Sequence, residues 1–249
     1  MACILHLETS ADTCSVAISE DGALLYAKEE MRGGAAGGRA EETATQGSKS
    51  IEVSFCLLVD EAISMIDSAG KRLDAVALSC GPGSYTGLRI SASMAKGICC
   101  GRDLPLIALP TLKVACVPVL LRDDLPEDAL LCPMIDARRM EVFAAVFDRA
   151  LTPLREVGAD VVEPDTYAAF LERGPVWFFG GGAAKCKDVI THPNARFVEN
   201  VKPLARWMFP LAEMAFHAGK FEDVAYFEPF YLKEFVATKP RNMLLELES

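Results

Sequence analysis

A glycine-rich loop, GPGSYTGLR from Gly81 to Arg89, is the stretch of this chain whose residue types most suggest a binding site. An apolar run before it predicts a buried strand over residues 73–80, and a helical pattern follows over residues 86–100. In such a strand–loop–helix unit, the free backbone N–H groups at the start of the helix can face an anion. The loop therefore indicates either a phosphate site or a rigid start for the helix.

The chemistry of the loop leaves both interpretations open. Gly81 and Gly83 permit a tight turn or a positive φ, and Pro82 fixes one backbone dihedral. Ser84 or Thr86 is suited to cap the helix. The loop lacks the lysine of a P-loop and the third glycine of a dinucleotide-binding fingerprint, so its glycines alone indicate phosphate binding only weakly.

The helix after the loop carries small side chains at every fourth position. Such a stripe lets a second helix approach closely, either within the same domain or from another chain. A neighbouring stripe is apolar and contains Ile90, Met94 and Ile98. The sequence therefore predicts a close helix contact, with its partner left open. The small stripe consists of Gly87, Ser91, Ala95 and Cys99.

Histidine and cysteine are not spaced as metal ligands in this sequence. The three histidines, His6, His192 and His217, are far apart, and the nine cysteines include no CxxC pair. Several cysteines lie in apolar runs, where a reduced thiol packs as a small hydrophobic group. The sequence therefore predicts no metal site and a reducing compartment.

The charge balance argues against a protein that binds nucleic acid on its own. The formal net charge is −10, and basic residues form only short groups that we interpret as solvated. No run of apolar residues has the length of about 18 that a membrane helix needs, and the first residues read directly into a strand pattern. We therefore expect a cytoplasmic protein without a membrane segment. The basic groups are Arg138–Arg139 and Lys233, Lys239 and Arg241.

The remaining pattern predicts two halves that resemble each other. The first half opens with strand-like runs joined by a turn signal at Glu20–Gly22, and a helical pattern covers residues 51–67. Between them, residues 33–49 are rich in glycine and alanine and lack apolar periodicity, which indicates a mobile loop. An apolar helix interrupted at Pro118 leads to the second half. There a strand ends at Asp136, a basic turn follows and an alternating strand returns, which repeats the opening pattern.

Several stretches, in order along the chain, resemble the TsaB (YeaZ) family. They are ILHLETSADTCSVAIS, GPGSYTGLRISASMAKG, DLPLIALPTL, MIDARRMEVFAAVFD and PFYLKE, of which the glycine loop is highly specific to the family. The resemblance implies an α/β protein with a duplicated actin-like (ASKHA, ribonuclease H-like) fold of two βββαβα-type halves. We expect these halves at residues 1–107 and 108–249, with the last segment packing back on the first half.

The resemblance implies a role in making threonylcarbamoyladenosine beside the anticodon of tRNA. In the family, TsaB is a non-catalytic subunit that pairs with the transferase TsaD, and the ATPase TsaE joins the complex. The resemblance further implies a homodimer when TsaD is absent, contact with tRNA only through the complex, and no cofactor beyond weakly bound ADP or ATP. The alternatives are a glycoprotease-like (M22) metallopeptidase and a weak ATPase of the actin-like superfamily.

The family's docking surface corresponds to the glycine loop and the two long helices of the first half. A charge at Ala95 is expected to disrupt docking while leaving the fold intact. The interface residues that the resemblance implies are Gly81, Pro82, Gly83, Ser84, Tyr85, Thr86, Gly87, Arg89, Ser91, Ala95, Cys99 and Leu57.

A degenerate nucleotide cleft is the second site that the resemblance implies, and no catalytic residue is assigned to it. The superfamily has an aspartate at the end of the first strand and a glycine nearby, whereas this chain has Glu8 followed by Thr9 and Ser10. The family's His-Ser pair before the first long helix is also replaced, by the segment rich in glycine and alanine. The predicted cleft residues are Glu8, Thr9, Ser10, Asp136, Gly180, Gly181 and Gly182, and the three glycines precede a predicted helix start.

Overall fold

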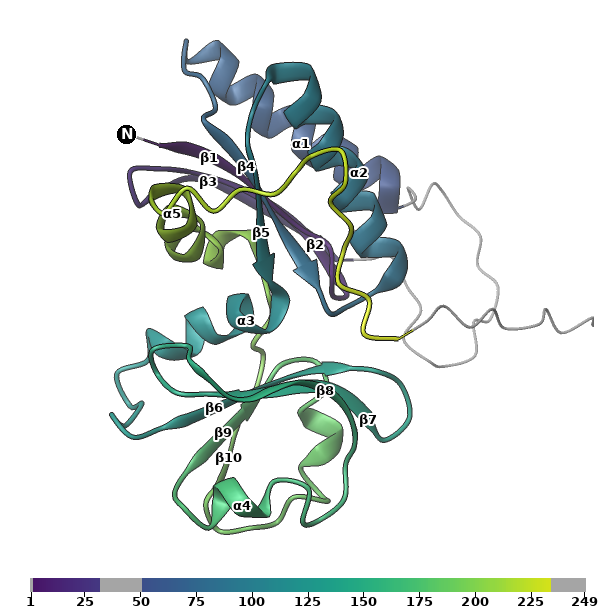
Figure 1. The fold of residues 1–249 in the computed structure, drawn as a ribbon, viewed down its shortest axis with the longest axis vertical. Coiled ribbons are helices and arrows are strands. Elements are labelled where there is room, and N and C mark those ends of the chain that lie inside the picture. The colour runs from purple at the N-terminus through teal and green to yellow at the C-terminus, as the bar shows by residue number, and fades with distance from the viewer. Residues whose placement is uncertain (1, 32–50, 234–249) are drawn as a thin grey trace, which may run out of the picture.

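Two five-stranded sheets, one in each half of the chain, form the framework of the protein (Figure 1). The computed structural model describes residues 2–31 and 51–233, and of Ile51 it describes the backbone alone. The predicted mobile loop at residues 33–49 and the basic residues Lys239 and Arg241 lie outside the described residues. Within the described ranges, no helix combines the length and the apolar character needed to span a bilayer.

The first sheet combines an antiparallel meander with two parallel strands, in the order β3-β2-β1-β4-β5. Asp21 and Gly22 both have positive φ, 52° and 74°, which is the geometry of a two-residue hairpin loop. This confirms the turn predicted at Glu20–Gly22. The strands are β1 (Cys3–Glu8), β2 (Thr13–Glu20), β3 (Ala23–Met31), β4 (Ala75–Gly81) and β5 (Leu106–Pro110).

The second sheet repeats the topology of the first, in the order β8-β7-β6-β9-β10. In each sheet the first strand pairs antiparallel with the second strand and parallel with the fourth. The prediction of two related α/β halves is thus confirmed. The strands are β6 (Leu130–Asp136), β7 (Glu141–Phe147), β8 (Pro153–Val161), β9 (Val176–Phe179) and β10 (Ala195–Val198).

Helices cover both faces of the first sheet. On one face lie α1 (Ile51–Ser68) and α2 (Tyr85–Arg102), which match the predicted helices to within two residues at each end. The opposite face is covered by η2 (Ala205–Trp207) and α5 (Phe209–His217), which return to the first sheet after the second is complete (Figure 1). The exact position of a domain boundary near residue 107 stays a prediction.

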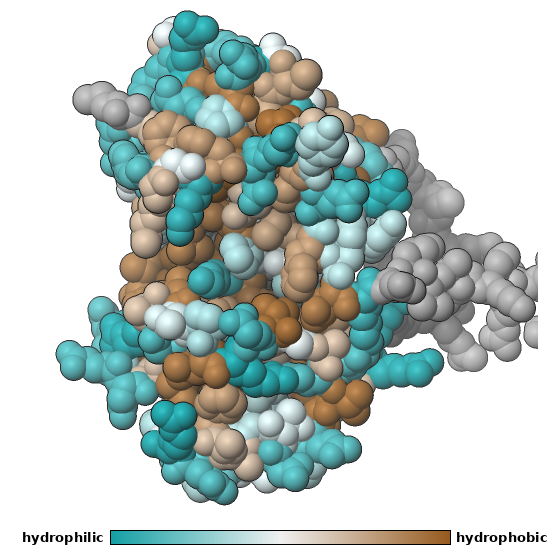
Figure 2. All heavy atoms as spheres, in the orientation of Figure 1, coloured by the Kyte–Doolittle hydropathy of each residue, from teal (hydrophilic) through white to brown (hydrophobic). Residues whose placement is uncertain are grey.

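The helix α3 (Thr111–Leu120) lies between the two sheets and packs on both (Figure 1). Val114 belongs to the core of the first half, whereas Cys116 and Val119 belong to that of the second. All three side chains are 0% exposed, which explains the apolar sequence of this helix. Hydrophobic residues also gather in the band where the two halves meet (Figure 2). The predicted interruption at Pro118 is wrong, because a proline in the last turn removes only one helical hydrogen bond.

The helices of the second half are shorter than those of the first. They are α4 (Ala168–Leu171) and the 3-10 turn η1 (Ala184–Cys186). The predicted helix start after the three glycines therefore gives a single turn. The segment after it has its apolar residues, Val189 and Ile190, at adjacent positions, so it offers no apolar stripe to continue a helix.

His6 is a buried histidine in the middle of β1. Its side chain is 0% exposed, and Nε2 hydrogen bonds to Ser19 Oγ at 2.8 Å. Nδ1 has no hydrogen-bond partner among the described residues. Burial disfavours the charged ring and lowers the pKa of His6 to about 3. The folded chain therefore keeps this imidazole neutral at pH values where the unfolded chain protonates it.

We expect the free energy of unfolding to fall as pH is lowered from 6.5 to about 3, because the unfolded state then binds one proton more at His6. The loss is at most about 1.4 kcal/mol per pH unit in that window, and it is absent above the window. Urea unfolding of a His6→Gln variant at several pH values should lack this part of the slope. His217→Gln, at an exposed histidine of α5, is the control. Identical slopes for wild type and His6→Gln would contradict the assignment.

Candidate functional site

The glycine loop connects β4 to α2, and most of its polar groups bond to the protein itself. Ser84 Oγ accepts a hydrogen bond from the backbone N–H of Gly87 at 3.3 Å, so Ser84 is the cap and Thr86 is not. The N–H of Ser84 donates to the backbone O of Ser10 at 2.8 Å. The N–H of Gly81 donates to Thr111 Oγ1 at 3.1 Å. Three backbone donors of the loop are therefore already used inside the chain.

Both glycines of the loop are required by contacts with the chain itself. A Cβ at Gly83 would lie 2.6 Å from the Cβ and from the backbone O of Ser10. Gly81 has a φ of +115°, and a Cβ there would lie 2.5 Å from the backbone O of Phe230. The N–H of Phe230 in turn donates to the backbone O of Cys80 at 2.7 Å. Because protein atoms fill the space beside these glycines, the structure favours a rigid start for the helix over a phosphate site.

A Gly83→Ala substitution is expected to lower the free energy of unfolding by about 1–3 kcal/mol, because its methyl group would collide with the backbone of Ser10. Gly97→Ala is the matched control, since a Cβ at this position of α2 meets no atom within 4 Å. That variant should be neutral or more stable by up to about 1 kcal/mol. Thermal unfolding without nucleotide measures both, and equal melting temperatures would argue against the packing role of Gly83.

At the end of β1, the predicted cleft residues of the first half bind one another and α2. Glu8 Oε1 accepts hydrogen bonds from the backbone N–H and from Oγ of Ser10, each at 2.5 Å. Thr9 Oγ1 donates to the backbone O of Gly87 at 2.7 Å. Glu8 and Thr9 are 0% exposed and Ser10 is 1% exposed. The structure thus brings these three residues together with the glycine loop, but it buries them.

In the second half, a lysine neutralises the aspartate at the corresponding turn. Asp136 Oδ1 accepts from the N–H of Arg138 at 2.8 Å and forms an ion pair with Lys185. Lys185 Nζ also donates to the backbone O of Arg139 at 2.6 Å and of Glu141 at 2.7 Å. All three hydrogens of the ammonium group therefore have acceptors. Sequence reasoning missed Lys185, because no spacing signal links η1 to the end of β6.

Two of the three glycines after β9 pack directly on β6 and β7. Gly180 has a φ of +99°, and a Cβ there would lie 2.4 Å from the backbone O of Met134. A Cβ at Gly182 would lie 2.9 Å from Val142 Cγ1. A Cβ at Gly181, by contrast, would meet no atom within 4 Å. Contacts between strands therefore account for Gly180 and Gly182 without a ligand.

The cysteines form no cluster with other ligand side chains. Across the ranges 2–31 and 51–233, no three histidine, cysteine, aspartate or glutamate side chains are grouped so that they could hold a metal ion. Burial raises the pKa of Cys80 to about 12 and that of Cys99 to about 11. These thiols therefore stay protonated at neutral pH, which suits the packing role predicted for cysteines in apolar runs.

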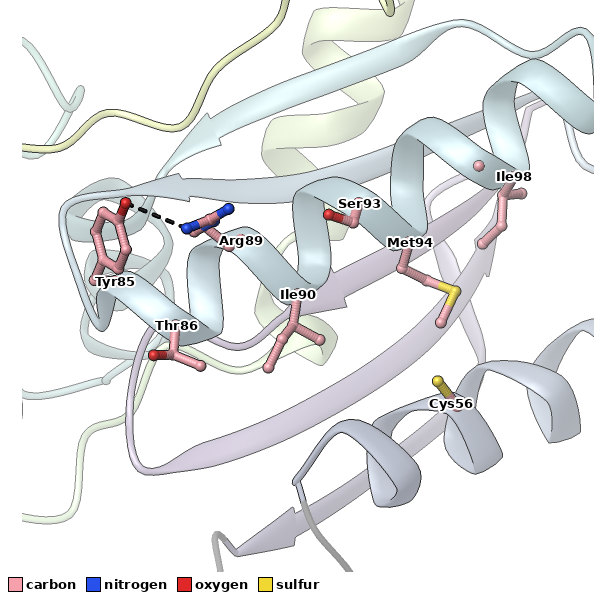
Figure 3. A pocket seen from close by; sticks show the side chains of 9 residues that line it. Cys56, Tyr85, Thr86, Arg89, Ile90, Ser93, Met94 and Ile98 are labelled. Carbon is pink, nitrogen blue, oxygen red and sulfur yellow. Dashed lines mark hydrogen bonds between the residues drawn. The ribbon is translucent and has the colours of Figure 1, made fainter.

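An apolar groove of about 680 Å³ lies between α1 and α2 (Figure 3). Ile90, Met94 and Ile98 share the side of α2 that faces α1, and Cys56 points toward them from α1 (Figure 3). Leu57 is 48% exposed on α1 and extends the accessible apolar surface. The predicted apolar stripe of α2 is thus available to a partner. The groove is lined by Cys56, Tyr85, Thr86, Arg89, Ile90, Ser93, Met94, Gly97 and Ile98.

A polar and aromatic cluster closes one end of the groove. Arg89 Nη1 donates to the hydroxyl of Tyr85 at 3.4 Å, and its guanidinium carbon lies 5.5 Å from the centre of the Tyr85 ring. The ring of Tyr231, from the segment after α5, lies 4.8 Å from that of Tyr85. Sequence reasoning found Tyr85 and Arg89 through the glycine loop, but it missed Tyr231, whose neighbourhood depends on the return of the chain.

The small-residue stripe of α2 faces the sheet and not the groove. Ser91 and Ala95 are 0% exposed, Cys99 is 2% exposed, and Gly87 is buried as well. Their small side chains let α2 lie close to the strands of its own domain. The prediction that these four residues contact another chain is therefore corrected.

The other predicted interface residues divide by exposure. Thr86, Arg89 and Leu57 are exposed, and Gly83, Ser84 and Tyr85 are half-buried. Gly81 and Pro82 are buried behind the segment after α5. The accessible members lie at the groove or beside it.

The predicted effect of a charge at Ala95 also changes with this correction. An Ala95→Glu substitution should destabilise the whole domain by about 3–5 kcal/mol, because it buries an unpaired charge between α2 and the sheet. Ser93→Glu, at an exposed position one turn away on the groove side, should leave the fold intact. Melting temperatures measure the difference, which should be about 10 °C. An Ala95→Glu protein as stable as Ser93→Glu would refute the corrected assignment.

The repeated strand order and the shared glycine loops define a duplicated actin-like α/β protein. Two structures from Pseudomonas aeruginosa have the same overall fold. One, described as similar to the peptidase YeaZ, has a TM-score of 0.73, is 22% identical and covers 94% of this chain and 100% of its own. The other, described as YeaZ, has a TM-score of 0.71 at 22% identity and covers 93% and 100%.

A family model described as TsaD, tRNA N6-adenosine threonylcarbamoyltransferase, matches residues 45–226, which is more than half of the chain. The tRNA threonylcarbamoyladenosine biosynthesis protein TsaB of Haemophilus influenzae is 25% identical over 95% of both chains. TsaB of Escherichia coli is 28% identical over 95% of this chain and 96% of its own. The chain belongs to the TsaB (YeaZ) family, within the wider family that the TsaD model describes.

Proposed function

We propose that this chain acts in the biosynthesis of threonylcarbamoyladenosine in tRNA, as a non-catalytic subunit that docks the transferase TsaD along the groove between α1 and α2. The names of the relatives from Haemophilus influenzae and Escherichia coli support the pathway. The division of labour between a scaffold and a transferase is our inference from the site.

The accessible apolar groove is the observation that carries the proposal. A surface of this kind, lined by Ile90, Met94 and Ile98 between two long helices, loses contact with water when a partner covers it. Leu57 and Val53, each 48% exposed, enlarge the apolar area on the α1 side. The groove itself is lined by helix side chains without an acid or base among them except Arg89, so it suits packing better than catalysis.

A partner of the same fold fits this groove best. The TsaD family model matches residues 45–226, a range that includes both α1 and α2. A transferase from Geobacter is also 31% identical over 110 residues, 43% of this chain and 31% of its own. A related chain is therefore expected to carry an equivalent pair of helices. Two such pairs can pack as four helices with interdigitated side chains.

The same reasoning describes the alternative pairing with a second copy of this chain. An isologous contact between two identical helix pairs would bury the same groove on both copies. We propose that TsaD replaces such a copy, that TsaE joins the resulting complex in the cytoplasm, and that any ADP or ATP binds only weakly.

The internal bonding of the phosphate-loop remnants supports a non-catalytic role. The loop glycines pack on Ser10 and Phe230, and Lys185 neutralises Asp136. A phosphate would have to displace those contacts before it could bind. These arrangements favour neither the metallopeptidase nor the ATPase alternative.

Docking is tested by a Leu57→Glu substitution, which places a charge on the exposed surface of α1 beside the groove. Co-purification with TsaD should fall at least tenfold, because the charge would be desolvated in the contact. Leu154→Glu is the matched control, since Leu154 is 42% exposed on β8 of the other half. Both variants should keep the wild-type melting temperature. Undiminished recovery of the complex with Leu57→Glu would rule out this face.

The division of labour is tested in the same assay by reconstituting tRNA modification from purified TsaD and TsaE, with and without this chain. Modification should require the chain, and Leu57→Glu should reduce it in proportion to the lost complex. Peptidase activity or ATP hydrolysis by the chain alone would contradict the scaffold role.

A further inference from the structure

The turn between β6 and β7 has an unusual backbone for the residues it contains. Arg138 and Arg139 are consecutive and both have positive φ, 70° and 49°. Side chains with a Cβ rarely adopt this conformation, and turns that need it usually have glycine, asparagine or aspartate there. The equivalent turn of the first half follows that rule, with Asp21 and Gly22 at its two positive-φ positions.

The protein holds the two arginines in this conformation from several sides. The N–H of Arg138 donates to Asp136 Oδ1 at 2.8 Å, and the N–H of Glu141 donates to the backbone O of Arg138 at 3.1 Å. Lys185 Nζ holds the backbone O of Arg139 at 2.6 Å. The tip of the turn is therefore fixed in place before any ligand arrives.

The acidic groups near the tip are already paired with lysines. Asp136 forms its ion pair with Lys185, and Glu141 forms one with Lys233. Within the part of the chain that the structure describes, the guanidinium groups of Arg138 and Arg139 form no ion pair, and both residues are exposed. The tip thus presents two uncompensated positive charges on a chain whose net charge is −10.

The tip is also connected to the aromatic end of the groove. Lys233 follows two residues after Tyr231, whose ring lies 4.8 Å from that of Tyr85. Arg89 lies over the Tyr85 ring. Basic and aromatic side chains therefore continue from the second half to the first, a combination typical of surfaces that contact nucleic acid.

We propose that Arg138 and Arg139 bind phosphate groups of an RNA backbone. Arginine matches phosphate geometry with paired donors, which explains why arginine would be kept where asparagine and glycine fit the backbone better. A nucleotide in the cleft would instead need the N–H groups of the turn. Those of Ala137 and Arg138 are already used by Glu141 O and Asp136 Oδ1. The choice of RNA rests on the proposed function, and the contact adds to binding within a complex instead of replacing it.

A double variant, Arg138→Asn with Arg139→Gly, separates this role from a structural one. It removes both charges and at the same time gives the turn residues suited to its backbone. The melting temperature should stay the same or rise, whereas affinity for a labelled anticodon stem-loop RNA should fall about five- to tenfold at low salt. The dependence of log affinity on log salt should weaken by about two phosphate contacts.

The matched control is Arg72→Ala with Arg173→Ala, which removes two exposed arginines elsewhere without an ion pair among the described residues. Its RNA affinity should change less than twofold. Arg138→Lys with Arg139→Lys should recover part of the affinity. The full-length chain is used throughout, with fluorescence anisotropy as the readout.

Three outcomes would overturn the proposal: no RNA binding by the wild-type chain at low salt, equal losses in the test and control variants, or a loss confined to ATP binding. The last would assign the arginines to a nucleotide. The docking test with Leu57→Glu uses no RNA, so either idea can fail without the other.

Discussion

Close contact of the chain with its own backbone at the glycine loop is the constraint on which the arrangement of the first half depends. Gly83 allows the loop to touch the turn after β1, and Gly81 allows the segment after α5 to cross it. With the loop fixed, Ser84 caps α2 in one orientation, and the small residues of that helix face the sheet. The apolar groove is therefore a consequence of this close packing, because α2 can then turn Ile90, Met94 and Ile98 only toward α1 and the surface.

Electrostatics in the second half follow a similar principle, because charged groups that could receive a ligand are satisfied within the chain. Lys185 uses all of its ammonium hydrogens on the turn between β6 and β7. Asp136 consequently faces a fixed cation supplied by the protein, so the turn needs no bound ion to hold its shape. What remains unpaired is at the outer tip, on Arg138 and Arg139. The inner side of this turn is thus structural, and its outer side is free to bind.

Sequence patterns predicted the elements better than the direction in which their residues point. The hairpin at Asp21–Gly22 and both long helices carry strong local signals, and they are found where expected. The stripe of Gly87, Ser91, Ala95 and Cys99 is equally clear, but spacing alone cannot distinguish a partner helix from the sheet beneath. On β2, the alternating serines suggest a solvent-facing side, yet Ser15 and Ser19 are buried. Their hydroxyls bond to Ala205 and His6, which only the return of the chain brings near.

That return has a consequence for how the protein is made. One face of the first sheet is covered by η2 and α5, which begin at Ala205 and Phe209. During synthesis, all five strands of this sheet leave the ribosome before the helices that shield Ile4 and Ala77 exist. The second half, by contrast, has its complete set of strands by Val198 and can form its own core early. The half that is translated first is therefore the half that finishes folding last.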